Sequence, residues 1–198
     1  MTRPAPRQRQ RGSKDLWLDA AYEMLISEGI EAVKIMPLAK RLNLTRTGFY
    51  WFFKDLAELH AAMIERWQNR NTDALVAQCE KPADSLCAAL FHVMDCWLDL
   101  AIRNWARNDA ALLARVTAAD SRRIEAVRDL FLRHGFAPEQ AQVRALTVML
   151  TQIGYSSMDI TEPRAERLAR VQHYVELFAG TPPTPAEAAE FLARHAPA

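Results

Sequence analysis

One stretch near the N-terminus, residues 34–59, constrains the fold more than any other part of the chain. It predicts a short helix, a tight turn and a second short helix. Leu38 and Ala39 give the first helix an apolar face, and Asn43 stands where that helix must end. Asn is the usual second choice, after Gly, for the left-handed residue that closes many helices. Thr45 suits the N-cap of the second helix, because its hydroxyl can accept a hydrogen bond from a free backbone N–H.

A helix, a turn of three to four residues and another helix make up the helix-turn-helix, whose second helix enters the major groove of DNA. The second helix of this pair opens with Arg46, Thr47 and Gly48, which supply a basic side chain, a hydroxyl group and a residue without a side chain. Such an opening suits contact with phosphates and base edges, since a helix N-terminus favours anions. The stretch therefore predicts binding to double-stranded DNA.

The same residues resemble a known family, the TetR-type transcriptional regulators, over roughly residues 13–62. The family commonly shows valine-serine-any-glycine-any-leucine-tyrosine-any-histidine-phenylalanine where this chain has the run from Leu44 to Phe53. Three residues depart from the family pattern, namely Thr47, Phe52 and Leu56. Leu56 stands where a lysine usually contacts the DNA backbone, so the resemblance implies one phosphate contact fewer. Further matches are Ala20-Ala21, Glu28-Gly29, Leu38-Ala39 and Leu59.

The predicted DNA-contacting residues fall at the start of the second helix and on both sides of the helix pair. Arg46 can pair with a guanine or with a phosphate, and the flanking lysines would contact backbone phosphates. The resemblance implies that Tyr50 supports a phosphate and that Trp51 faces the groove. The alternative, a plain helical hairpin with its aromatics in the core, is expected for Phe49 and Phe53. The full predicted set is Lys34, Thr45, Arg46, Thr47, Tyr50, Trp51 and Lys54.

The distribution of charge supports this assignment, although the net charge of the chain is only +1. Residues 1–54 hold ten Lys and Arg against five Asp and Glu, whereas the remainder holds fifteen against nineteen. Such asymmetry is typical of a chain whose basic part meets nucleic acid. Residues 1–12 carry four arginines and no acid. We expect them to form a flexible basic tail, either solvated or reaching for phosphates or the minor groove.

Neither a secretion signal nor a membrane span is indicated by the sequence. Residues 1–12 lack an apolar segment, and no apolar run approaches the roughly 18 residues needed to cross a membrane. We therefore expect a cytoplasmic protein whose cysteines, Cys79, Cys87 and Cys96, are reduced. The four-residue spacing of His92 and Cys96 is better explained by helix packing than by a metal site. No cofactor is expected, and enzyme signatures such as a phosphate-binding loop are missing.

Apolar residues at helical spacing, and residues that typically begin or end helices, recur along the chain and predict an all-α fold of about nine to ten helices. We expect a tail over 1–12, a three-helix helix-turn-helix DNA-binding domain over 13–62, and a larger C-terminal helical bundle over 63–198. The segment 83–105 is apolar nearly all round, which is typical of a buried central helix. Beyond the helix-turn-helix pair, helices are predicted over residues 13–28, 56–80, 83–105, 109–116, 121–134, 138–159, 163–180 and 185–195.

The predicted central helix carries a stripe of mostly large apolar side chains, comprising Cys87, Phe91, Met94, Trp97, Leu98, Ala101 and Trp105. Such a stripe is more often core than pocket, but the resemblance implies a ligand cavity inside the C-terminal bundle. A neighbouring polar stripe of His92, Asp95 and Asp99 is either a solvated face with an Asp99–Arg103 pair or an anchor for a cationic ligand. We predict a pocket for an apolar or aromatic small molecule, lined by Phe91, Met94, Trp97, Trp105, Met149, Gln152 and Tyr155.

Two further apolar stripes lie on the last two long helices. They comprise Val143, Leu146, Met149, Leu150 and Ile153, then Leu168, Val171, Val175 and Phe178. In similar proteins this helix pair forms a dimer interface, and an intrachain core role can hold at the same time. The sequence thus predicts a homodimeric, ligand-responsive transcriptional repressor that binds a palindromic operator. The competing hypothesis is an all-α small-molecule binding protein or enzyme in which the helix-turn-helix is incidental.

Overall fold

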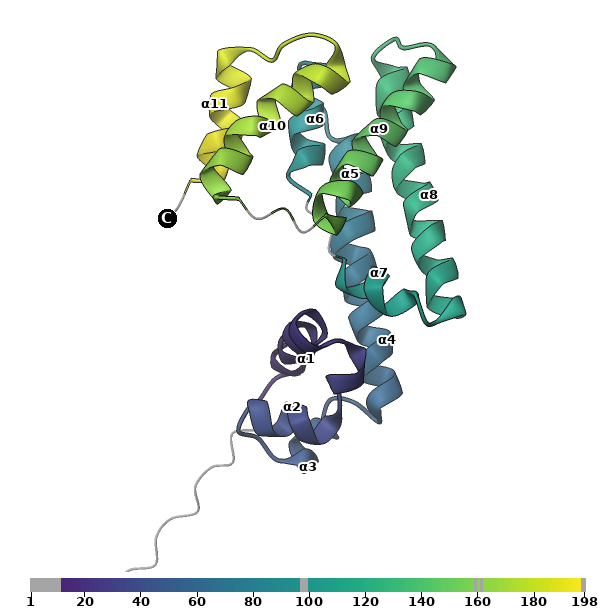
Figure 1. The fold of residues 1–198 in the computed structure, drawn as a ribbon, viewed down its shortest axis with the longest axis vertical. Helices are drawn as coiled ribbons and strands as arrows, with labels where there is room; N and C mark the ends of the chain where they lie inside the picture. Colours follow the sequence, from purple (N-terminus) through teal and green to yellow (C-terminus); the bar gives the residue numbers. More distant parts are fainter. Residues whose placement is uncertain (1–11, 97–99, 159, 161, 197–198) are drawn as a thin grey trace, which may run out of the picture. The chain divides into compact units, whose positions relative to one another are not determined.

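The computed structural model describes residues 12–96, 100–158, 160 and 162–196. Within these ranges the regular structure is entirely helical (Figure 1), which confirms the predicted all-α fold. The chain divides into two compact units, an N-terminal unit of Met1–Arg66 and a C-terminal unit of Trp67–Ala198. Among the described residues no helix is long and apolar enough to span a membrane.

The N-terminal unit packs its helices around an aromatic and aliphatic core. Trp17 and Phe49 meet edge to face with ring centroids 5.4 Å apart, and Phe53 lies 5.4 Å from Phe49. Ser13 caps the first helix as predicted, since its hydroxyl accepts a hydrogen bond from Leu16 N at 3.1 Å. The elements are α1 (Lys14–Glu28), η1 (Ile30–Ala32), α2 (Ile35–Arg41), α3 (Arg46–Phe49) and α4 (Leu56–Trp67).

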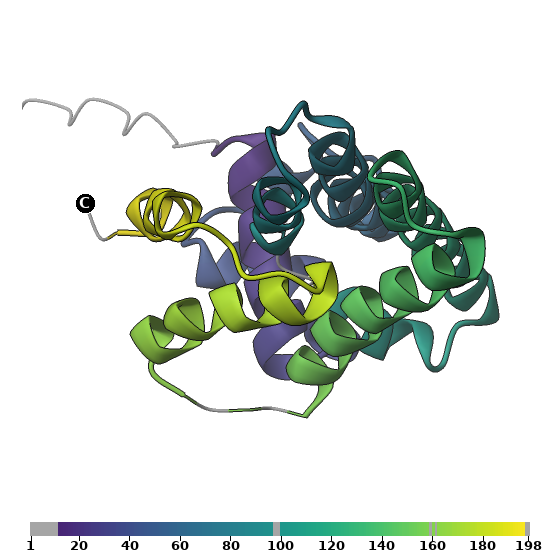
Figure 2. The same cartoon turned by 90° about the horizontal axis from the view of Figure 1, so that it is seen from above.

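The C-terminal unit is a helical bundle in which α8 lies along α5 and α9, and α6 lies against α10 and α11 (Figure 1). Figure 2 shows α9 and α10, drawn in green and lime, at one side of this unit. Apolar residues from α5, α6 and α8 to α11 form one continuous core. The elements are η2 (Gln68–Asp73), α5 (Ala74–Glu80), α6 (Leu86–Met94), α7 (Ala101–Ala106), α8 (Ala110–Arg133), α9 (Pro138–Ser157), α10 (Arg164–Ala179) and α11 (Pro185–Arg194).

Several predicted helix ends are confirmed by their capping geometry. Thr184 and Glu187 form the expected capping box at the start of α11, in which each side chain bonds to the backbone of the other residue. Gly180 ends α10 in the left-handed conformation, at φ 80°. The chain also stays helical from Leu56 to Glu80, as predicted, although its middle section η2 has π-helical hydrogen bonding.

The prediction of one central helix over 83–105 is wrong. α6 ends at Met94, and α7 begins only at Ala101. Asp95, the C-cap of α6, is held by α11 instead, because His195 Nε2 lies 2.7 Å and Arg194 Nη2 lies 3.2 Å from its carboxylate oxygens. Hydrophobic spacing identified the buried positions Cys87, Phe91 and Met94 before the break, but after it Ile102 and Ala106 are buried and the predicted Ala101 and Trp105 are only half-buried. The spacing carried no information about the contact of Asp95 with residues about a hundred positions away.

The predicted pair of helices over 109–116 and 121–134 is also wrong, because α8 is one continuous helix. The connecting residues contain neither Gly nor Pro, so nothing in the backbone ends the helix there. The Thr117 hydroxyl donates to the backbone oxygen of Leu113, one turn earlier, at 3.0 Å, as is common for Thr inside a helix. Residues 117–120, between the two predicted helices, are therefore part of α8 and do not form a loop.

A buried polar cluster joins η2 to α8 and α7 within the C-terminal unit. Arg123 is only 1% exposed, donates to Thr72 Oγ1 at 3.3 Å and forms an ion pair with Asp120. Arg103 binds the same carboxylate through two nitrogens, at 2.8 and 2.7 Å. Arg103 thus pairs with Asp120, and Asp99, the partner that the sequence predicts, lies outside the described residues. The Arg123 guanidinium also lies 5.6 Å from the centre of the Trp67 ring.

Candidate functional site

The turn between α2 and α3 has the geometry of a helix closed by a left-handed residue. Asn43 has φ 53°, the one positive φ among the described residues other than glycine. Leu44 N donates to Ala39 O at 2.8 Å and Asn43 N donates to Lys40 O at 3.1 Å. These two bonds form a Schellman motif, which satisfies the last carbonyls of α2 and reverses the chain within a few residues. The prediction for Asn43 is confirmed.

The helix that follows this turn is capped and seated by its first residues. Thr45 has extended backbone, and its Oγ1 accepts from Gly48 N at 3.3 Å, as predicted. Gly48 and Phe49 are buried, whereas the residues around them are exposed. α3 itself is a single turn, and Phe52 N and Phe53 N both donate to Phe49 O. Phe49 and Phe53 belong to the core, as the sequence predicts, so the other side chains of this turn face outward.

The structure places all seven predicted DNA-contacting residues on the surface of the N-terminal unit. Trp51 is 63% exposed and Tyr50 is 44% exposed, which is unusual for such large aromatic side chains. Arg46 Nη2 and Nε donate to the Tyr50 hydroxyl at 2.9 and 3.3 Å, and the guanidinium lies over the phenol ring. This contact pre-orders Arg46 alongside Tyr50 and leaves the remaining guanidinium N–H groups available as donors.

Two lysines flank this surface. Lys34 is the exposed N-cap residue of α2, and Lys54 is exposed just before α4. The nearby acids bind backbone groups at the start of α4: Glu58 Oε2 accepts from Lys54 N at 2.6 Å, and Asp55 Oδ1 accepts from Glu58 N at 2.9 Å. These hydrogen bonds hold the carboxylates of Glu58 and Asp55 against the backbone, whereas Lys34 and Lys54 remain on the surface.

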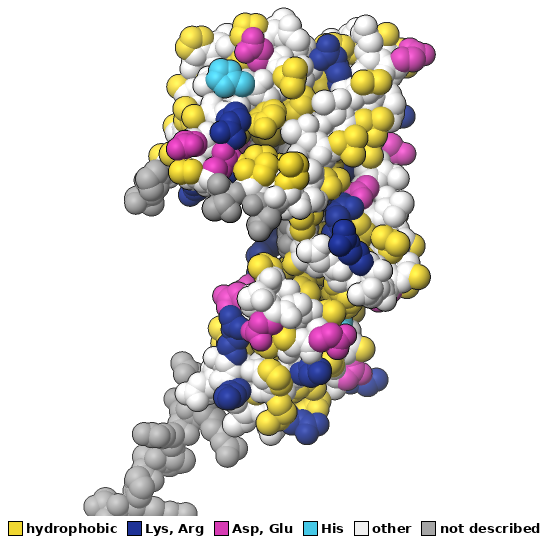
Figure 3. Space-filling view, in the orientation of Figure 1, with side chains coloured by type: hydrophobic (Ala, Val, Ile, Leu, Met, Phe, Trp, Pro, Cys, Tyr) yellow, Lys and Arg dark blue, Asp and Glu magenta, His cyan; other side chains and the backbone are white. Residues whose placement is uncertain are grey.

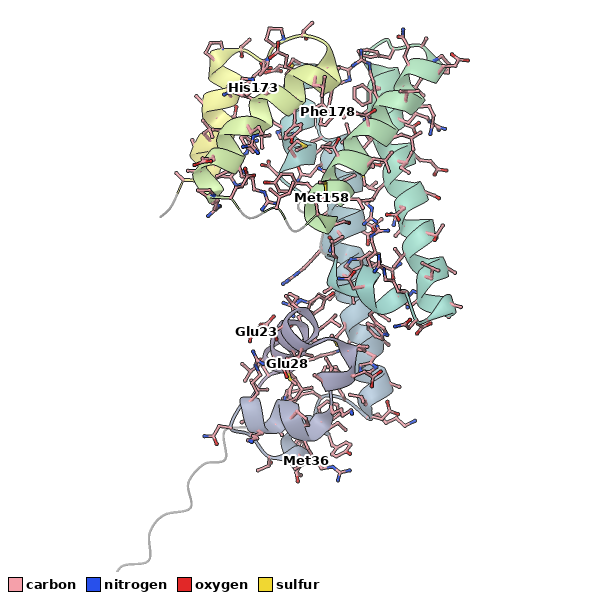
Figure 4. The ribbon with its side chains drawn as sticks, viewed as in Figure 1. Glu23, Glu28, Met36, Met158, His173 and Phe178 are labelled. Carbon is pink, nitrogen blue, oxygen red and sulfur yellow. The ribbon has the colours of Figure 1, made fainter. Side chains whose placement is uncertain are left out.

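Sequence reasoning missed part of the exposed surface of α2. Met36 and Lys40 are both exposed, and they are four residues apart on the same face of the helix. That spacing was the signal that could have identified them. Arg41, by contrast, pairs with Glu28 at 3.1 Å and Glu23 at 3.5 Å (Figure 4 labels Met36 and both glutamates). Figure 3 shows Lys and Arg side chains around hydrophobic ones at the end of the unit formed by α2 and α3.

A helix, a closed turn and a second helix whose first turn exposes basic, hydroxyl and aromatic side chains define a helix-turn-helix DNA-binding protein. Residues 18–63 match the family model described as bacterial regulatory proteins, tetR family. The N-terminal unit accordingly carries a DNA-binding domain of the kind found in bacterial regulatory proteins of the tetR family.

Two known proteins are similar to the chain beyond this domain. It is 26% identical over 133 residues to the uncharacterized HTH-type transcriptional regulator YobS of Bacillus subtilis (strain 168), an alignment covering 65% of this chain and 68% of that protein. The crystal structure of Mycobacterium smegmatis AmtR is similar in fold, with a TM-score of 0.58 and 16% identity. That match covers 96% of this chain and 97% of the other.

The C-terminal unit contains a pocket of about 40 Å³ between the end of α6, α9 and α10. Of the predicted ligand-contacting residues, Met94, Gln152 and Tyr155 line it. Phe91 and Met149 lie in the core instead, where Phe91 stacks on Phe191 with centroids 5.0 Å apart. Trp105 is half-buried on α7 and is not part of the lining, and Trp97 lies outside the described residues. The other lining residues are Cys96, Thr151, Ser156, Glu162, Arg167, Arg170, Val171 and Tyr174.

Charged side chains line this pocket, which the sequence did not predict. Arg170 Nη1 pairs with Glu162 Oε2 at 2.7 Å, and the Arg167 guanidinium lies 4.5 Å from the centre of the Tyr155 ring. Burial lowers the pKa of Arg167, and the charge of Glu162 partly offsets that effect. Arg167, Arg170 and Tyr174 recur at helical spacing on one face of α10. This polar spacing was visible in the sequence beside the apolar stripe that was identified.

Of the predicted polar stripe, His92 and Asp95 lie at the end of α6, and Asp99 lies outside the described residues. Asp95 is already bound by His195 and Arg194 of α11. Burial lowers the pKa of His92, and the nearby charges of Arg194 and Lys81 lower it further. The binding of Asp95 by two residues of the C-terminal segment is a structural contact between α6 and the end of α11.

Proposed function

We propose that the protein is a homodimeric, ligand-responsive transcriptional repressor that acts in the cytoplasm on a palindromic operator. The observation that carries the DNA-binding part of this proposal is the exposure of Arg46, Tyr50 and Trp51 directly after the closed turn at Asn43. Each N-terminal unit would place α3 in a major groove, with Arg46 directed at a base edge or a phosphate. Lys34, Lys54, Thr45 and Thr47 would contact the DNA backbone.

The dimer part of the proposal depends on an exposed apolar stripe of the C-terminal unit. Val143 and Leu150 of α9 are 62% and 64% exposed and lie seven residues apart, with Leu146 half-buried between them. Leu177 of α10 is 67% exposed. Heptad spacing of this kind suits packing against a helix of a second copy. Figure 3 shows hydrophobic side chains over α9 and the neighbouring part of α10.

The α10 stripe predicted from the sequence has the intrachain core role, which was one of its two expected roles. Leu168, Val171, Val175 and Phe178 are all buried inside the chain, as Figure 4 shows for Phe178 in contrast to the outward-facing His173. Charged substitutions at Val171 and Val175 would therefore unfold the C-terminal unit instead of separating two protomers. Two copies joined through Val143, Leu150 and Leu177 would favour half-sites about 34 Å apart or a multiple of that distance.

The ligand part of the proposal assigns the pocket beside α9 and α10 to a small-molecule effector. A ligand changes DNA affinity only through a difference in its affinity for the DNA-bound and free conformations. α10 contributes both the pocket residues Arg167 and Arg170 and the exposed Leu177. A guest in the pocket thus acts on the same helix that we assign to the dimer.

The test begins with selection of operator sequences from random duplex DNA, followed by fluorescence anisotropy titrations over a range of salt. We expect steeply salt-dependent binding to a palindrome, because several phosphates are neutralised by each protomer. Arg46→Ala and Tyr50→Ala should each weaken binding by about 1–3 kcal/mol without loss of helical circular dichroism. Arg128→Ala, which removes an exposed arginine of α8, is the matched control and should bind normally. Wild-type affinity in both N-terminal variants would contradict the assigned DNA contacts.

A further inference from the structure

The pocket between α6, α9 and α10 has a lining that specifies the chemical class of its ligand. The inference rests on the ligand response proposed above. The pocket volume of about 40 Å³ is well below the 300–1,000 Å³ typical of sites that enclose a drug-sized molecule. It still exceeds the space of a single water. The pocket therefore suits a polar group of a few atoms, with the rest of the ligand outside the enclosed part.

Apolar side chains supply part of the lining. Met94 and Val171 are buried, and Tyr174 stacks on Phe178 with ring centroids 6.1 Å apart. Because Phe178 is itself a core residue, the Tyr174 ring is held in a fixed position. These residues provide a surface for a hydrocarbon or aromatic body next to the polar group.

Three buried oxygen atoms of the lining lack a hydrogen-bond partner within the described part of the chain. The side chain of Glu162 is only 10% exposed; its Oε2 binds Arg170, but its Oε1 has no donor. The Tyr155 hydroxyl and Gln152 Oε1 are also buried without a hydrogen-bond partner in the described part of the chain. A buried polar atom without a partner destabilises the fold, so a ligand that supplies the missing partners gains that free energy on binding.

The unpaired oxygen of Glu162 requires a hydrogen-bond donor from the ligand. A carboxylate oxygen can only accept hydrogen bonds, so the ligand must bring an N–H or O–H group to Glu162 Oε1. Carboxylates and fully ionised phosphates offer acceptors alone and leave this atom unsatisfied. They would also place a second negative charge beside the glutamate.

The charges of the lining also disfavour cationic ligands. Arg167 and Arg170 carry two positive charges against the one negative charge of Glu162, so the lining is cationic overall. Arg170 already neutralises much of the Glu162 charge through their 2.7 Å contact. An ammonium or amidinium ligand would meet two guanidinium groups at close range and is disfavoured. The suitable head group is therefore neutral, with both a donor and an acceptor.

We propose that this pocket binds the carboxamide group of a small neutral amide. The amide N–H donates to Glu162 Oε1, and the amide carbonyl accepts from the Tyr155 hydroxyl. Gln152 offers a further amide that can pair with either side of the ligand group. The apolar body of the ligand packs on Tyr174 and Val171.

Four compounds that share one ring and differ in head group test this assignment, namely benzamide, benzoate, benzamidine and toluene. Their affinities for the full-length protein are measured by ligand-detected NMR titration. Benzamide is expected to bind with a dissociation constant of about 1 mM, as befits a small fragment, and the other three at least about tenfold more weakly. Tighter binding of benzoate or benzamidine overturns the proposal, as does equal binding of toluene or no binding of benzamide.

Substitution of Glu162 separates recognition from simple filling of the pocket. Glu162→Gln should weaken benzamide binding about tenfold, because the ligand N–H then donates to a neutral amide oxygen in place of a charged carboxylate oxygen. The same change makes the lining more positive, so benzoate should bind more tightly than it does to the wild type. Glu166→Gln, at an exposed position in the first turn of α10, is the matched control and should leave both affinities unchanged. Unaltered head-group preference in Glu162→Gln would refute the role of this carboxylate.

The inference and the proposed function fail in different ways. Operator affinity is measured by anisotropy with and without saturating benzamide. A protein that binds its operator but none of the four compounds overturns the amide site and leaves the DNA-binding function standing. A protein that binds benzamide through Glu162, with no change in operator affinity, retains the amide site and loses the proposed ligand response.

Discussion

Removal of the Asp120 carboxylate should destabilise the C-terminal unit far more than its position in the sequence indicates. Asp120 pairs with Arg123, which is 1% exposed, and with Arg103 at 2.7 and 2.8 Å. Asp120→Ala would leave the Arg123 guanidinium buried without its counter-charge. Such a loss costs about 3–5 kcal/mol when the pair is fully buried. Because the Asp120 side chain is itself 22% exposed, water can partly replace it, and we expect the lower end of that range, about 3 kcal/mol.

A second substitution identifies the cause of this loss. Arg123→Met removes the buried charge and keeps much of its hydrophobic stem, so the double variant Asp120→Ala/Arg123→Met should recover about 1–2 kcal/mol relative to Asp120→Ala alone. Asp129→Ala, in an exposed pair with Arg128 on the same helix, is the control and should change stability by less than about 0.5 kcal/mol. Stability is measured by urea unfolding, followed by both circular dichroism and tryptophan fluorescence because the chain has two units.

The same carboxylate predicts a pH dependence with a definite sign. Burial opposes ionisation of Asp120, but the hydrogen bonds and charges of Arg103 and Arg123 outweigh it, so the pKa lies below its ordinary value of 3.8. A lowered carboxyl pKa stabilises the folded state above the ordinary pKa, and this stabilisation is lost as pH falls through the folded-state pKa. The difference between wild type and Asp120→Ala should therefore be constant near neutral pH and shrink below about pH 4. A pH-independent difference, or a loss under 1 kcal/mol at pH 7, would refute the reasoning.

Two further predictions concern the turn and the dimer. Asn43→Ala places a side chain that disfavours the left-handed region at φ 53° and should cost about 1–2 kcal/mol in urea unfolding, whereas Asn43→Gly should stay within about 1 kcal/mol of wild type; equal stability of all three would contradict the role of the left-handed turn. Leu150→Glu should give a folded monomer with weakened operator binding in analytical ultracentrifugation and anisotropy, while Ile26→Glu, at an exposed position of α1, should remain dimeric; an unchanged Leu150→Glu dimer would place the interface elsewhere.

The helix-turn-helix and many helix ends could be predicted from the sequence, because these features depend on residues close together in the chain. Asn43 closes α2 through its own backbone conformation, and Thr45 caps α3 through a residue three positions away. Thr184 and Glu187 begin α11 in the same local way. The buried aromatics of the N-terminal unit also followed from the pattern, since Phe49 and Phe53 are four residues apart, the spacing of one face of the predicted second helix.

Tertiary contacts set which apolar face turns inward and where a long apolar segment breaks. Val171 and Leu150 are equally apolar in sequence, yet the first is buried within the chain and the second is largely exposed, because α9 and α10 have neighbours on particular sides. At the break after Met94, Asp95 contacts His195, and in the charged pocket Glu162 meets Arg170 beside Tyr155. Hydrophobic periodicity reports which side chains avoid water. It does not report which partner covers them, because that choice is made by contacts between residues far apart in the chain.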